Sequence, residues 1–327
     1  MKLQELADLA GVSPATVSRV FSHHPNVKRE VRDSVLALAR KHRYHPRLPA
    51  RQRNVVLILP RSEIYPIRNC LEMVMMALTA VLPGRGFRIE VLPDDNLDRL
   101  ESLQFCGAVA IGADPAAFKD WGVRFPPSLV LIDREAAPGS RNVFSVHSDE
   151  KQGMDLAVGC LHERGCGKIG CVIHGAPGTG NADVRRAAVL DALARRGLPA
   201  ADSLVHLCGE DAEYLEVIGR MLKLGIDGLF CPGGSAGIIA AYALSLFNKR
   251  VPDEVSLVAS ENKLYSRYAT PPQTTITQDH IRLAEIAADI IEAFPDASRV
   301  PSRTVLPYSL IVRDSVRSEE SVGKVPG

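Results

Sequence analysis

The chain has 327 residues, of which 46% are apolar, and its 39 Lys and Arg nearly balance its 38 Asp and Glu. Single cores stop growing at about 250 to 300 residues, so this length excludes one small domain and predicts two domains or more, with substantial cores. No apolar run of about 18 residues is present, which excludes a typical membrane-spanning helix.

The charge is distributed unevenly along the chain. Residues 1–53 contain eleven Lys and Arg, four Asp and Glu and four of the nine His, so they carry a formal +7 and leave −6 for the remainder. A basic head on an acidic body predicts a polyanionic partner that binds the head alone. A solvated basic tail is the alternative, but this segment carries three helical periodicities and is therefore expected to fold.

Residues 3–21, LQELADLAGVSPATVSRVF, predict two short helices joined by a tight turn. The apolar residues of the first helix repeat at a spacing of three and four, namely Leu3, Leu6, Ala7 and Ala10. Gly11 supplies the positive φ that ends this helix, Ser13 is a natural N-cap and Pro14 suits the first helical position. The second helix has its own apolar face at Val17, Val20 and Phe21. This pattern is typical of a helix-turn-helix, whose second helix can lie in the DNA major groove.

The string GVSPATVSRV, residues 11–20, closely resembles the headpiece of the LacI/GalR (lactose-repressor) family of bacterial transcription regulators. The resemblance continues through a third predicted helix at residues 28–42 and through the Tyr44-His45-Pro46 that closes it. It implies a helix-turn-helix DNA-binding headpiece over residues 1–45.

The resemblance also implies a set of DNA-contacting side chains in the headpiece: Ser13, Pro14, Ala15, Thr16, Ser18, Arg19, His23 and Asn26. Of these, Pro14, Ala15 and Arg19 are expected to read bases and the others to contact the phosphate backbone. Arg19 suits a bidentate guanine contact, which is worth roughly 1 to 3 kcal/mol of discrimination. The alternative for Arg19 is a solvated surface charge.

Residues 46–54, PRLPARQRN, occupy the place of a hinge that in this family folds on DNA and inserts a leucine into the minor groove. The leucine expected two places after Arg51 is Arg53 here, and Pro49 confines any helix to a short segment that is marginal alone. Two interpretations stay open. Either Leu48 supplies the wedge in a shifted register, or Arg51 and Arg53 enter a narrowed minor groove electrostatically. We favour the second, because the usual spacer before the next strand is also missing.

From residue 55 onward strands and helices alternate, which predicts parallel sheets covered on both faces. The first series has strands at 55–59, 88–92, 106–111 and 128–132, and helical segments at 70–82, 95–103 and 115–121. The second has strands at 168–173, 203–207, 227–231 and 255–259, and helices at 150–164, 182–196, 212–224 and 235–247. The chain is then expected to cross back at 274–277, and a helix at 279–294 with strands near Thr304 and Leu310 to rejoin the first sheet.

By resemblance, this α/β body is a two-lobed, periplasmic-binding-protein-like effector domain with two parallel sheets. We expect a hinge or linker at 46–54, an N-terminal lobe at 55–149 plus 278–316, a C-terminal lobe at 150–277 and a disordered tail at 317–327. In open α/β sheets ligands bind at the carboxyl ends of the strands, here in the cleft between the lobes.

Two residues match the family's effector-binding positions. Arg185, in RRAAVLDAL, takes the place of the effector-binding arginine, and Glu261, within residues 251–276, occupies the position of an acidic ligand. An arginine and a carboxylate opposed across a cleft suit a polyhydroxylated ligand such as a sugar. Weaker candidates, from loops at strand ends, are Tyr65, Asp133, Asp149 and Asn181. The alternatives are a helix cap for Asp149 and a surface charge for Arg185.

Two departures from the family pattern concern the effector. The chain has Gly233-Gly234 where relatives usually have Asn-Asp or Gly-Asp, and it has Glu261 where Asp is usual. We therefore expect an effector unlike that of well-known relatives, and a regulator that has lost its small-molecule response is the alternative.

Little in the sequence supports an enzyme. Residues 175–180, GAPGTG, follow a strand, but no Gly-Lys-Ser/Thr follows and Pro177 removes an amide donor. Neither a Gly-x-Ser-x-Gly elbow nor a spaced metal-ligand cluster occurs. We therefore predict no catalytic residue, no metal and no cofactor. The seven cysteines contain no Cys-x-x-Cys pair and are expected to be free thiols in a reducing cytoplasm, and the first helix does not fit a signal peptide.

The sequence thus predicts a cytoplasmic, homodimeric transcription regulator, with repression the favoured sign. Its partners would be a palindromic double-stranded DNA operator and a sugar-like effector that modulates operator affinity. The alternatives from other classes are a cytoplasmic sugar-binding protein with a vestigial head and an enzyme built on the two-lobed body.

Overall fold

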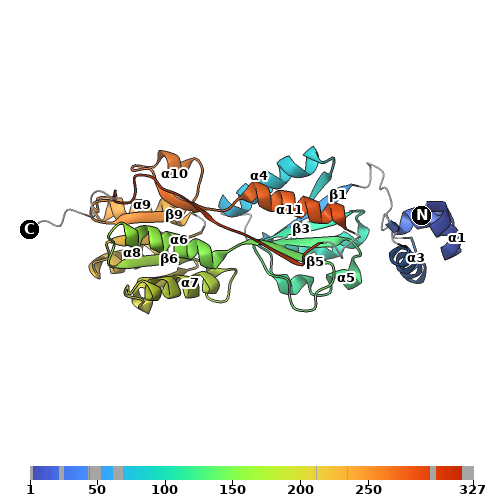
Figure 1. Cartoon of the computed structure of the whole chain (residues 1–327), viewed down its shortest axis with the longest axis horizontal. Helices are drawn as coiled ribbons and strands as arrows, with labels where there is room; N and C mark the ends of the chain where they lie inside the picture. The colour runs from blue at the N-terminus through green and yellow to red at the C-terminus, as the bar shows by residue number, and fades with distance from the viewer. Residues whose placement is uncertain are drawn as a thin grey trace, which may run out of the picture. The chain divides into compact units, whose positions relative to one another are not determined.

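A computed structural model of the chain describes residues 3–21, 26–42, 44, 53–61, 69–210, 212–233, 235–294 and 300–318 (Figure 1). The chain forms two compact units. The first contains the N-terminal helices with residues 53–61, 71–147 and 280–304, and the second contains residues 148–279 and 305–318. Within the described residues, none of the helices has the length and apolar character needed to cross a membrane.

The N-terminal helices are those that the sequence predicts: α1 (Leu3–Ala10), α2 (Pro14–Phe21) and α3 (Arg29–Lys41). Gly11 adopts a φ of +63° between the first two, as its place in the turn requires. The three helices share one small core, which contains Leu6, Ala7, Val17, Val20, Val35, Ala39 and Tyr44. The helix-turn-helix prediction is therefore confirmed.

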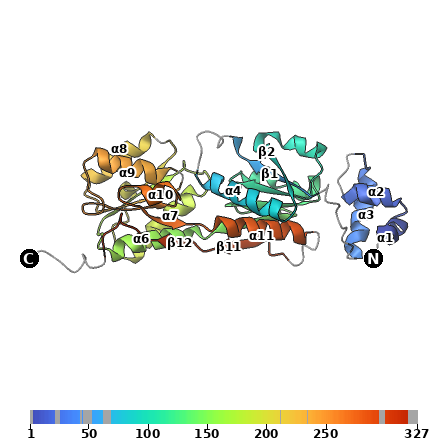
Figure 2. The same ribbon diagram turned by 90° about the horizontal axis from the view of Figure 1, so that it is seen from above.

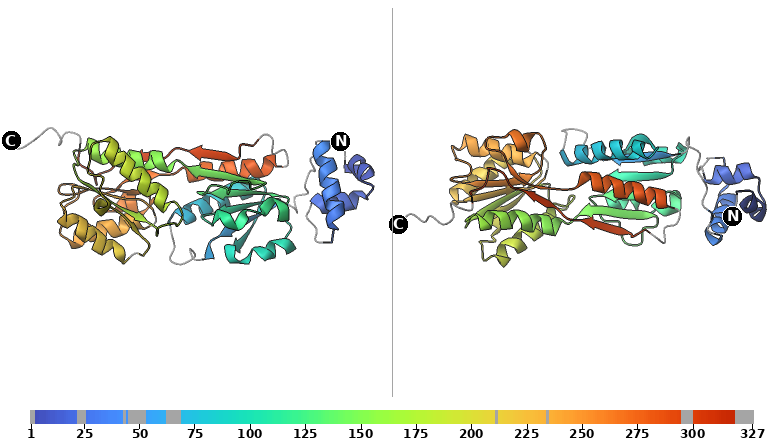
Figure 3. Two further views of the ribbon diagram at one scale, coloured as in Figure 1. Left: turned by 90° about the horizontal axis from the view of Figure 1, so that it is seen from below. Right: turned by 45° about the horizontal axis from the view of Figure 1, so that its top comes forward.

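The first unit has a sheet with the strand order β11-β5-β4-β3-β1-β2. Its strands are β1 (Asn54–Leu59), β2 (Arg88–Pro93), β3 (Gly107–Ile111), β4 (Ser128–Ile132), β5 (Val143–Ser148) and β11 (Arg303–Leu306). The helical segments are α4 (Asn69–Gly84), η3 (Asp94–Ser102), η4 (Pro115–Phe118), α5 (Trp121–Arg124) and α11 (His280–Ala293). Figure 3 shows α11, in red, and α5, in teal, on opposite sides of this sheet. The strand β5 is absent from the sequence prediction, because its alternating polar residues resemble the flanking turns.

The second unit has a sheet with the strand order β12-β10-β9-β8-β6-β7. Its strands are β6 (Ile169–His174), β7 (Val205–Cys208), β8 (Gly228–Cys231), β9 (Ser256–Ser260), β10 (Thr274–Thr277) and β12 (Ser309–Ile311). The helices are α6 (Glu150–Glu163), α7 (Ala182–Arg195), η5 (Asp202–Leu204), α8 (Glu213–Lys223), α9 (Ala236–Leu246) and α10 (Tyr265–Tyr268). In β6, Cys171 and Ile173 pack with α6 and α7, whereas Val172 packs with α8 and α9. Figure 2 shows α8 and α9 on one side of this unit and α6 on the other. Both faces of the sheet are therefore covered, as predicted for parallel strands.

The C-terminal part of the chain differs from its prediction. Residues 274–277 form β10, which lies beside β9 in the second sheet instead of only crossing back. The strand near Leu310 does not rejoin the first sheet, because β12 pairs antiparallel with β10. Polar contacts explain this placement: the amide of Thr274 donates to the Ser315 hydroxyl at 2.8 Å, and that hydroxyl donates to the Leu257 carbonyl at 2.6 Å. Only β11 joins the first sheet.

The helix α9 approaches the second sheet closely at Gly237. A Cβ at this position would lie 2.6 Å from the Cβ of Ala259 and 3.1 Å from the amide oxygen of Gln273. The Gln273 amide also donates to the Gly237 carbonyl at 2.8 Å. Neither neighbour has room to move, because Ala259 belongs to β9 and Gln273 is buried.

We therefore expect Gly237→Ala to lower the free energy of unfolding by about 1 to 3 kcal/mol, because overpacking forces the helix away from the strand. Gly84→Ala is the matched control, since Gly84 also lies in a helix but has nothing within 4 Å of its Cβ position. Urea denaturation of both variants measures the difference. Equal stabilities would contradict the packing described for Gly237.

Candidate functional site

One face of α2 is buried and the other is at the surface. Val17 and Val20 are fully buried, whereas Ala15 and Arg19, four residues apart, are exposed. Ser13 caps the helix, because its hydroxyl accepts a hydrogen bond from the Thr16 amide at 3.1 Å. The exposed face thus carries two of the three predicted base-reading residues, and the third, Pro14, is half-buried beside them.

The remaining predicted DNA contacts have varied positions. Ser18 is half-buried on α2, and Asn26 is exposed in the turn before α3. His23 and Arg51 lie outside the described residues. Arg53 directly precedes β1, and its guanidinium lies over the ring of Phe87 at 4.2 Å and donates to Glu292 at 2.8 Å. Arg53 is thus held by the first unit, and its role at DNA stays a prediction.

The carboxyl ends of three neighbouring strands meet at one edge of the second sheet. Here β6 ends at His174, β8 at Cys231 and β9 at Ser260. The amide of Gly233 donates to the Ser260 hydroxyl at 2.8 Å, which joins the loops that follow β8 and β9. A Cβ at Gly233 would lie 3.0 Å from Nη1 of Arg185, so this loop also contacts α7.

Arg185 forms a buried ion pair with Glu150, the first residue of α6. Its Nε donates to Oε2 at 2.7 Å and its Nη2 to Oε1 at 2.7 Å, which is a bidentate arrangement. The two side chains are only 17% and 8% exposed, so Arg185 is not the surface charge that the alternative interpretation supposed. The amide of Asn181 donates to the same carboxylate at 3.0 Å. The structure thus brings the predicted Arg185 and Asn181 together. Both donate to Glu150, which was not predicted from the sequence.

Glu150 keeps its charge despite its burial. Burial alone would raise the pKa of its carboxyl, but the charge of Arg185 and hydrogen bonds from Arg185, Asn181 and Tyr308 outweigh that effect. The pKa of Glu150 is therefore lowered from its ordinary value. At neutral pH the pair consists of a carboxylate and a guanidinium.

Tyr308 is brought to Glu150 by α6 itself. The Gln152 side chain accepts from the Tyr308 amide at 2.7 Å and donates to the Tyr308 carbonyl at 3.1 Å. The ring lies against the helix backbone at Gly153, where a Cβ would be 2.6 Å from Cδ2 of Tyr308. A glycine is therefore required at position 153 for the ring to lie here.

The two predicted aspartates lie in different units. The Asp149 side chain accepts from the Gln152 amide at 3.0 Å and caps α6, which confirms the alternative that we gave for it. Asp133 directly follows β4 of the first unit, is 9% exposed, and has a φ of +58°. Their roles as effector ligands stay predictions, and Tyr65 lies outside the described residues.

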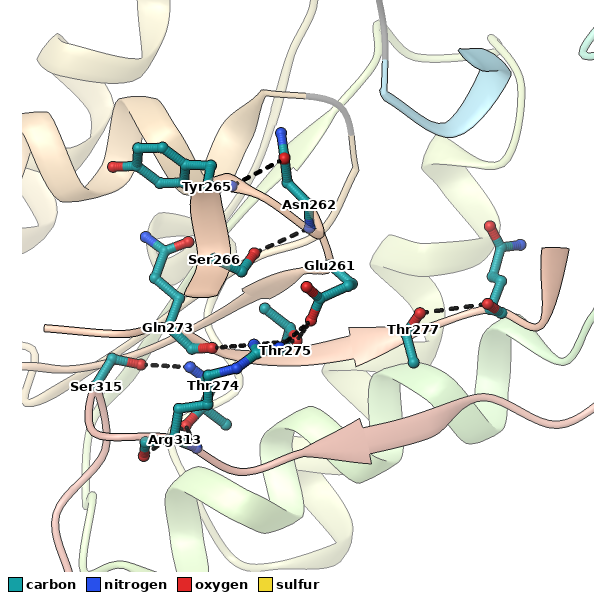
Figure 4. A network of polar contacts seen from close by, with 11 residues as sticks. Glu261, Asn262, Tyr265, Ser266, Gln273, Thr274, Thr275, Thr277, Arg313 and Ser315 are labelled. Atoms are coloured by element: carbon teal, nitrogen blue, oxygen red, sulfur yellow. Dashed lines mark hydrogen bonds and ion pairs between the residues drawn. The ribbon is translucent and has the colours of Figure 1, made fainter. Parts of the chain in front are cut away.

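Glu261 has partners from the C-terminal part of the chain. Figure 4 shows its carboxylate beside Thr275, whose hydroxyl donates to it, and Arg313, whose Nη2 donates to it at 2.9 Å. The Glu261 side chain is only 4% exposed. Its carboxylate is thus bound by Arg313 instead of by Arg185, and its role as an effector ligand stays a prediction.

Three residues of these contacts were not predicted from the sequence: Glu150, Tyr308 and Arg313. Glu150 follows the predicted cap Asp149 directly, so a second carboxylate at a strand-to-helix boundary was the available signal. Tyr308 and Arg313 lie in a segment assigned to the other lobe, and no local pattern connects them with Glu150 or Glu261.

Two family models match the chain. Residues 2–47 match the model described as bacterial regulatory proteins, lacI family, and residues 158–316 match the periplasmic binding protein-like domain. Among curated proteins, the HTH-type transcriptional regulator GalR of Escherichia coli (strain K12) is 28% identical, over 96% of this chain and 95% of the relative. The sucrose operon repressor of Streptococcus mutans serotype c is 24% identical, over 96% of this chain and 99% of the relative.

Solved structures share the fold. The complex of the transcriptional regulator CelR with cellobiose has a TM-score of 0.69 and 21% sequence identity. The match covers 96% of this chain and 99% of the CelR chain. The lac repressor dimer bound to operator and the anti-inducer ONPF has a TM-score of 0.69 and 18% sequence identity. The match covers 97% of this chain and 99% of the repressor chain.

Removal of the Arg185 guanidinium would leave a buried carboxylate without a counter-ion. We expect Arg185→Leu to lower the free energy of unfolding by about 3 to 5 kcal/mol. Arg186→Leu is the matched control, because the neighbouring Arg186 pairs with an Asp202 whose side chain is 84% exposed, and its loss should change stability by about 1 kcal/mol or less. Urea denaturation measures both. Similar effects would contradict the buried pair.

The stabilisation by Glu150 should depend on pH. Because its pKa is lowered in the folded protein, its contribution is present above the ordinary Glu pKa of about 4.3 and is lost as the pH falls through the folded value. We expect Glu150→Gln to destabilise the protein most above about pH 5 and progressively less below about pH 4.3, as measured by denaturation at a series of pH values. A pH-independent difference would contradict this assignment.

Proposed function

Because the chain belongs to the LacI family of bacterial regulatory proteins, we propose that it is a sequence-specific DNA-binding transcription repressor whose operator affinity is controlled by a small sugar-like effector. The main support for this proposal is the exposed face of α2, which presents Ala15 and Arg19. The opposite face of α2 packs in the core of the three N-terminal helices. The proposed function is regulatory, and no catalytic step is part of it.

The headpiece would place α2 in the major groove. Pro14, Ala15 and Arg19 would contact base edges, and the side chains proposed to contact phosphates are Ser13, Thr16, Ser18, His23 and Asn26. A single helix reads only a few base pairs, so a homodimer with two headpieces would bind a palindromic site with two half-sites. The solved lac repressor, which is described as a dimer bound to operator, supports this arrangement.

The effector site would use the strand ends of the second sheet. Asn181 and Arg185 are its best-supported members, because Asn181 lies in the loop that follows β6 and Arg185 approaches the loop that follows β8. Several relatives are named for sugars, among them the sucrose and ribose operon repressors, and one solved structure contains cellobiose. We further propose a reducing, cytoplasmic location, which is supported by six described cysteines that are all free thiols.

Selection from random double-stranded DNA with the purified protein should enrich a palindrome. Arg19→Ala should then relax discrimination at one base position in each half-site by about 1 to 3 kcal/mol, because a bidentate guanine contact is lost. The readout is the dissociation constant for the selected operator and for operators changed at single positions.

Arg29→Ala is the control, because Arg29 is an exposed headpiece arginine on α3 that pairs with Asp33. Its loss should weaken binding to all sequences equally or not at all. Absence of any enriched sequence at moderate salt would refute the proposed function, and equal discrimination by wild type and Arg19→Ala would remove Arg19 from base reading.

A further inference from the structure

We propose that Glu150 determines the charge class of the effector, so that the site at Arg185 accepts an uncharged polyhydroxylated ligand and disfavours a sugar acid or a sugar phosphate. The inference rests on the proposed function, because it concerns the same effector site. It follows from what Glu150 does to the Arg185 guanidinium.

The Arg185 fork is already bound to a carboxylate. Nε and Nη2, which form one of the two paired-donor edges of the guanidinium, both donate to Glu150 at 2.7 Å. An anionic ligand would have to displace Glu150 to obtain the same contacts. Glu150 is tethered at the start of α6, directly after the cap residue Asp149, so its effective concentration at Arg185 exceeds that of a free ligand at the millimolar level.

The Glu150 carboxylate is also held by other groups. It accepts from Nε and Nη2 of Arg185, from the Asn181 amide and from the Tyr308 hydroxyl. A carboxylate offers about four acceptor positions, so these four donors satisfy it. Displacement by a ligand would leave a buried, charged oxygen without its donors, which is unfavourable.

The net charge of the pair disfavours anions further. A guanidinium and a carboxylate side by side sum to zero, so an approaching anion is attracted by Arg185 and repelled by Glu150 at similar distances. Burial strengthens both the attraction and the repulsion, because the two side chains are only 17% and 8% exposed. Gly233, which faces Nη1 of Arg185 from the loop after β8, has no side chain and adds no charge. An uncharged hydroxyl does not have to compete with Glu150 for the fork.

The test compares matched neutral and acidic sugars. Glucose with glucuronate, galactose with galacturonate, and glucose with glucose 6-phosphate are titrated into the full-length protein in a phosphate-free buffer by calorimetry, with thermal shifts as a second readout. We expect wild type to bind no acid or phosphate more tightly than its neutral counterpart. Glu150→Gln should gain about tenfold or more in affinity for the acids, because the Arg185 charge is no longer neutralised.

Two further variants identify the cause of any gain. Asp155→Asn makes the same change in net charge on the same helix, but Asp155 pairs with Arg195 and Arg196, so it should gain no affinity for acids. The double variant Glu150→Gln with Arg185→Gln should lose the gain that Glu150→Gln shows.

The proposal is overturned if wild type prefers an acid or phosphate to its neutral counterpart, or if folded Glu150→Gln gains no anion binding. Should Glu150→Gln fail to fold, as judged by circular dichroism, the wild-type comparison decides alone. In that case wild type must bind a neutral sugar and bind its acid less tightly, and any other result overturns the proposal. Operator binding by wild type is measured on the same preparation, so a failure of the proposed regulatory function is detected separately.

Discussion

The second unit depends on one constraint, which is that a buried charge must be paired. Glu150 is buried and Arg185 is largely shielded from water, and the unfavourable loss of hydration is offset because each supplies the other's counter-ion in a bidentate geometry. Their pairing fixes the start of α6 against the first turns of α7. Through Gln152 and Tyr308 it also fixes the segment between β11 and β12. Three parts of the chain thus meet at one carboxylate.

Glu261 obeys the same constraint at a second place. Its carboxylate, at the end of β9, is neutralised by Arg313, which follows β12. Both buried carboxylates of this edge therefore receive a donor from the last part of the chain, Tyr308 in one case and Arg313 in the other. This explains why β12 belongs to the second sheet. Without that segment Glu150 would lack one of its donors, and Glu261 would lack its counter-ion.

A structural feature could be predicted from the sequence when the residues that determine it are close together in the chain. Gly11 and Ser13 act on their immediate neighbours, and the spacing of Val17 and Val20 defines a helix face, so the headpiece and its exposed residues were predictable. The Arg185–Glu150 pair joins residues 35 positions apart, and the Gln152–Tyr308 contact joins residues 156 positions apart. Periodicity carries no information about such partners. For the same reason β12 was assigned to the wrong sheet, and the contact of Arg53 with Phe87 was not predicted.

DNA binding and effector binding, the two parts of the proposed function, therefore differ in how much the type of a single residue indicates about its role. Arg19 is exposed on a helix surface, so its type and position are enough to infer a chemical role toward DNA. The Arg185 side chain is only 17% exposed and is paired, so its charge toward a ligand is the sum of its own and that of its neighbour. The same arginine beside an uncharged residue would attract anions, whereas beside Glu150 it provides hydrogen-bond donors without net charge. In a buried site of this kind, ligand class is a property of the pair, and a motif that identifies only the arginine leaves it undetermined.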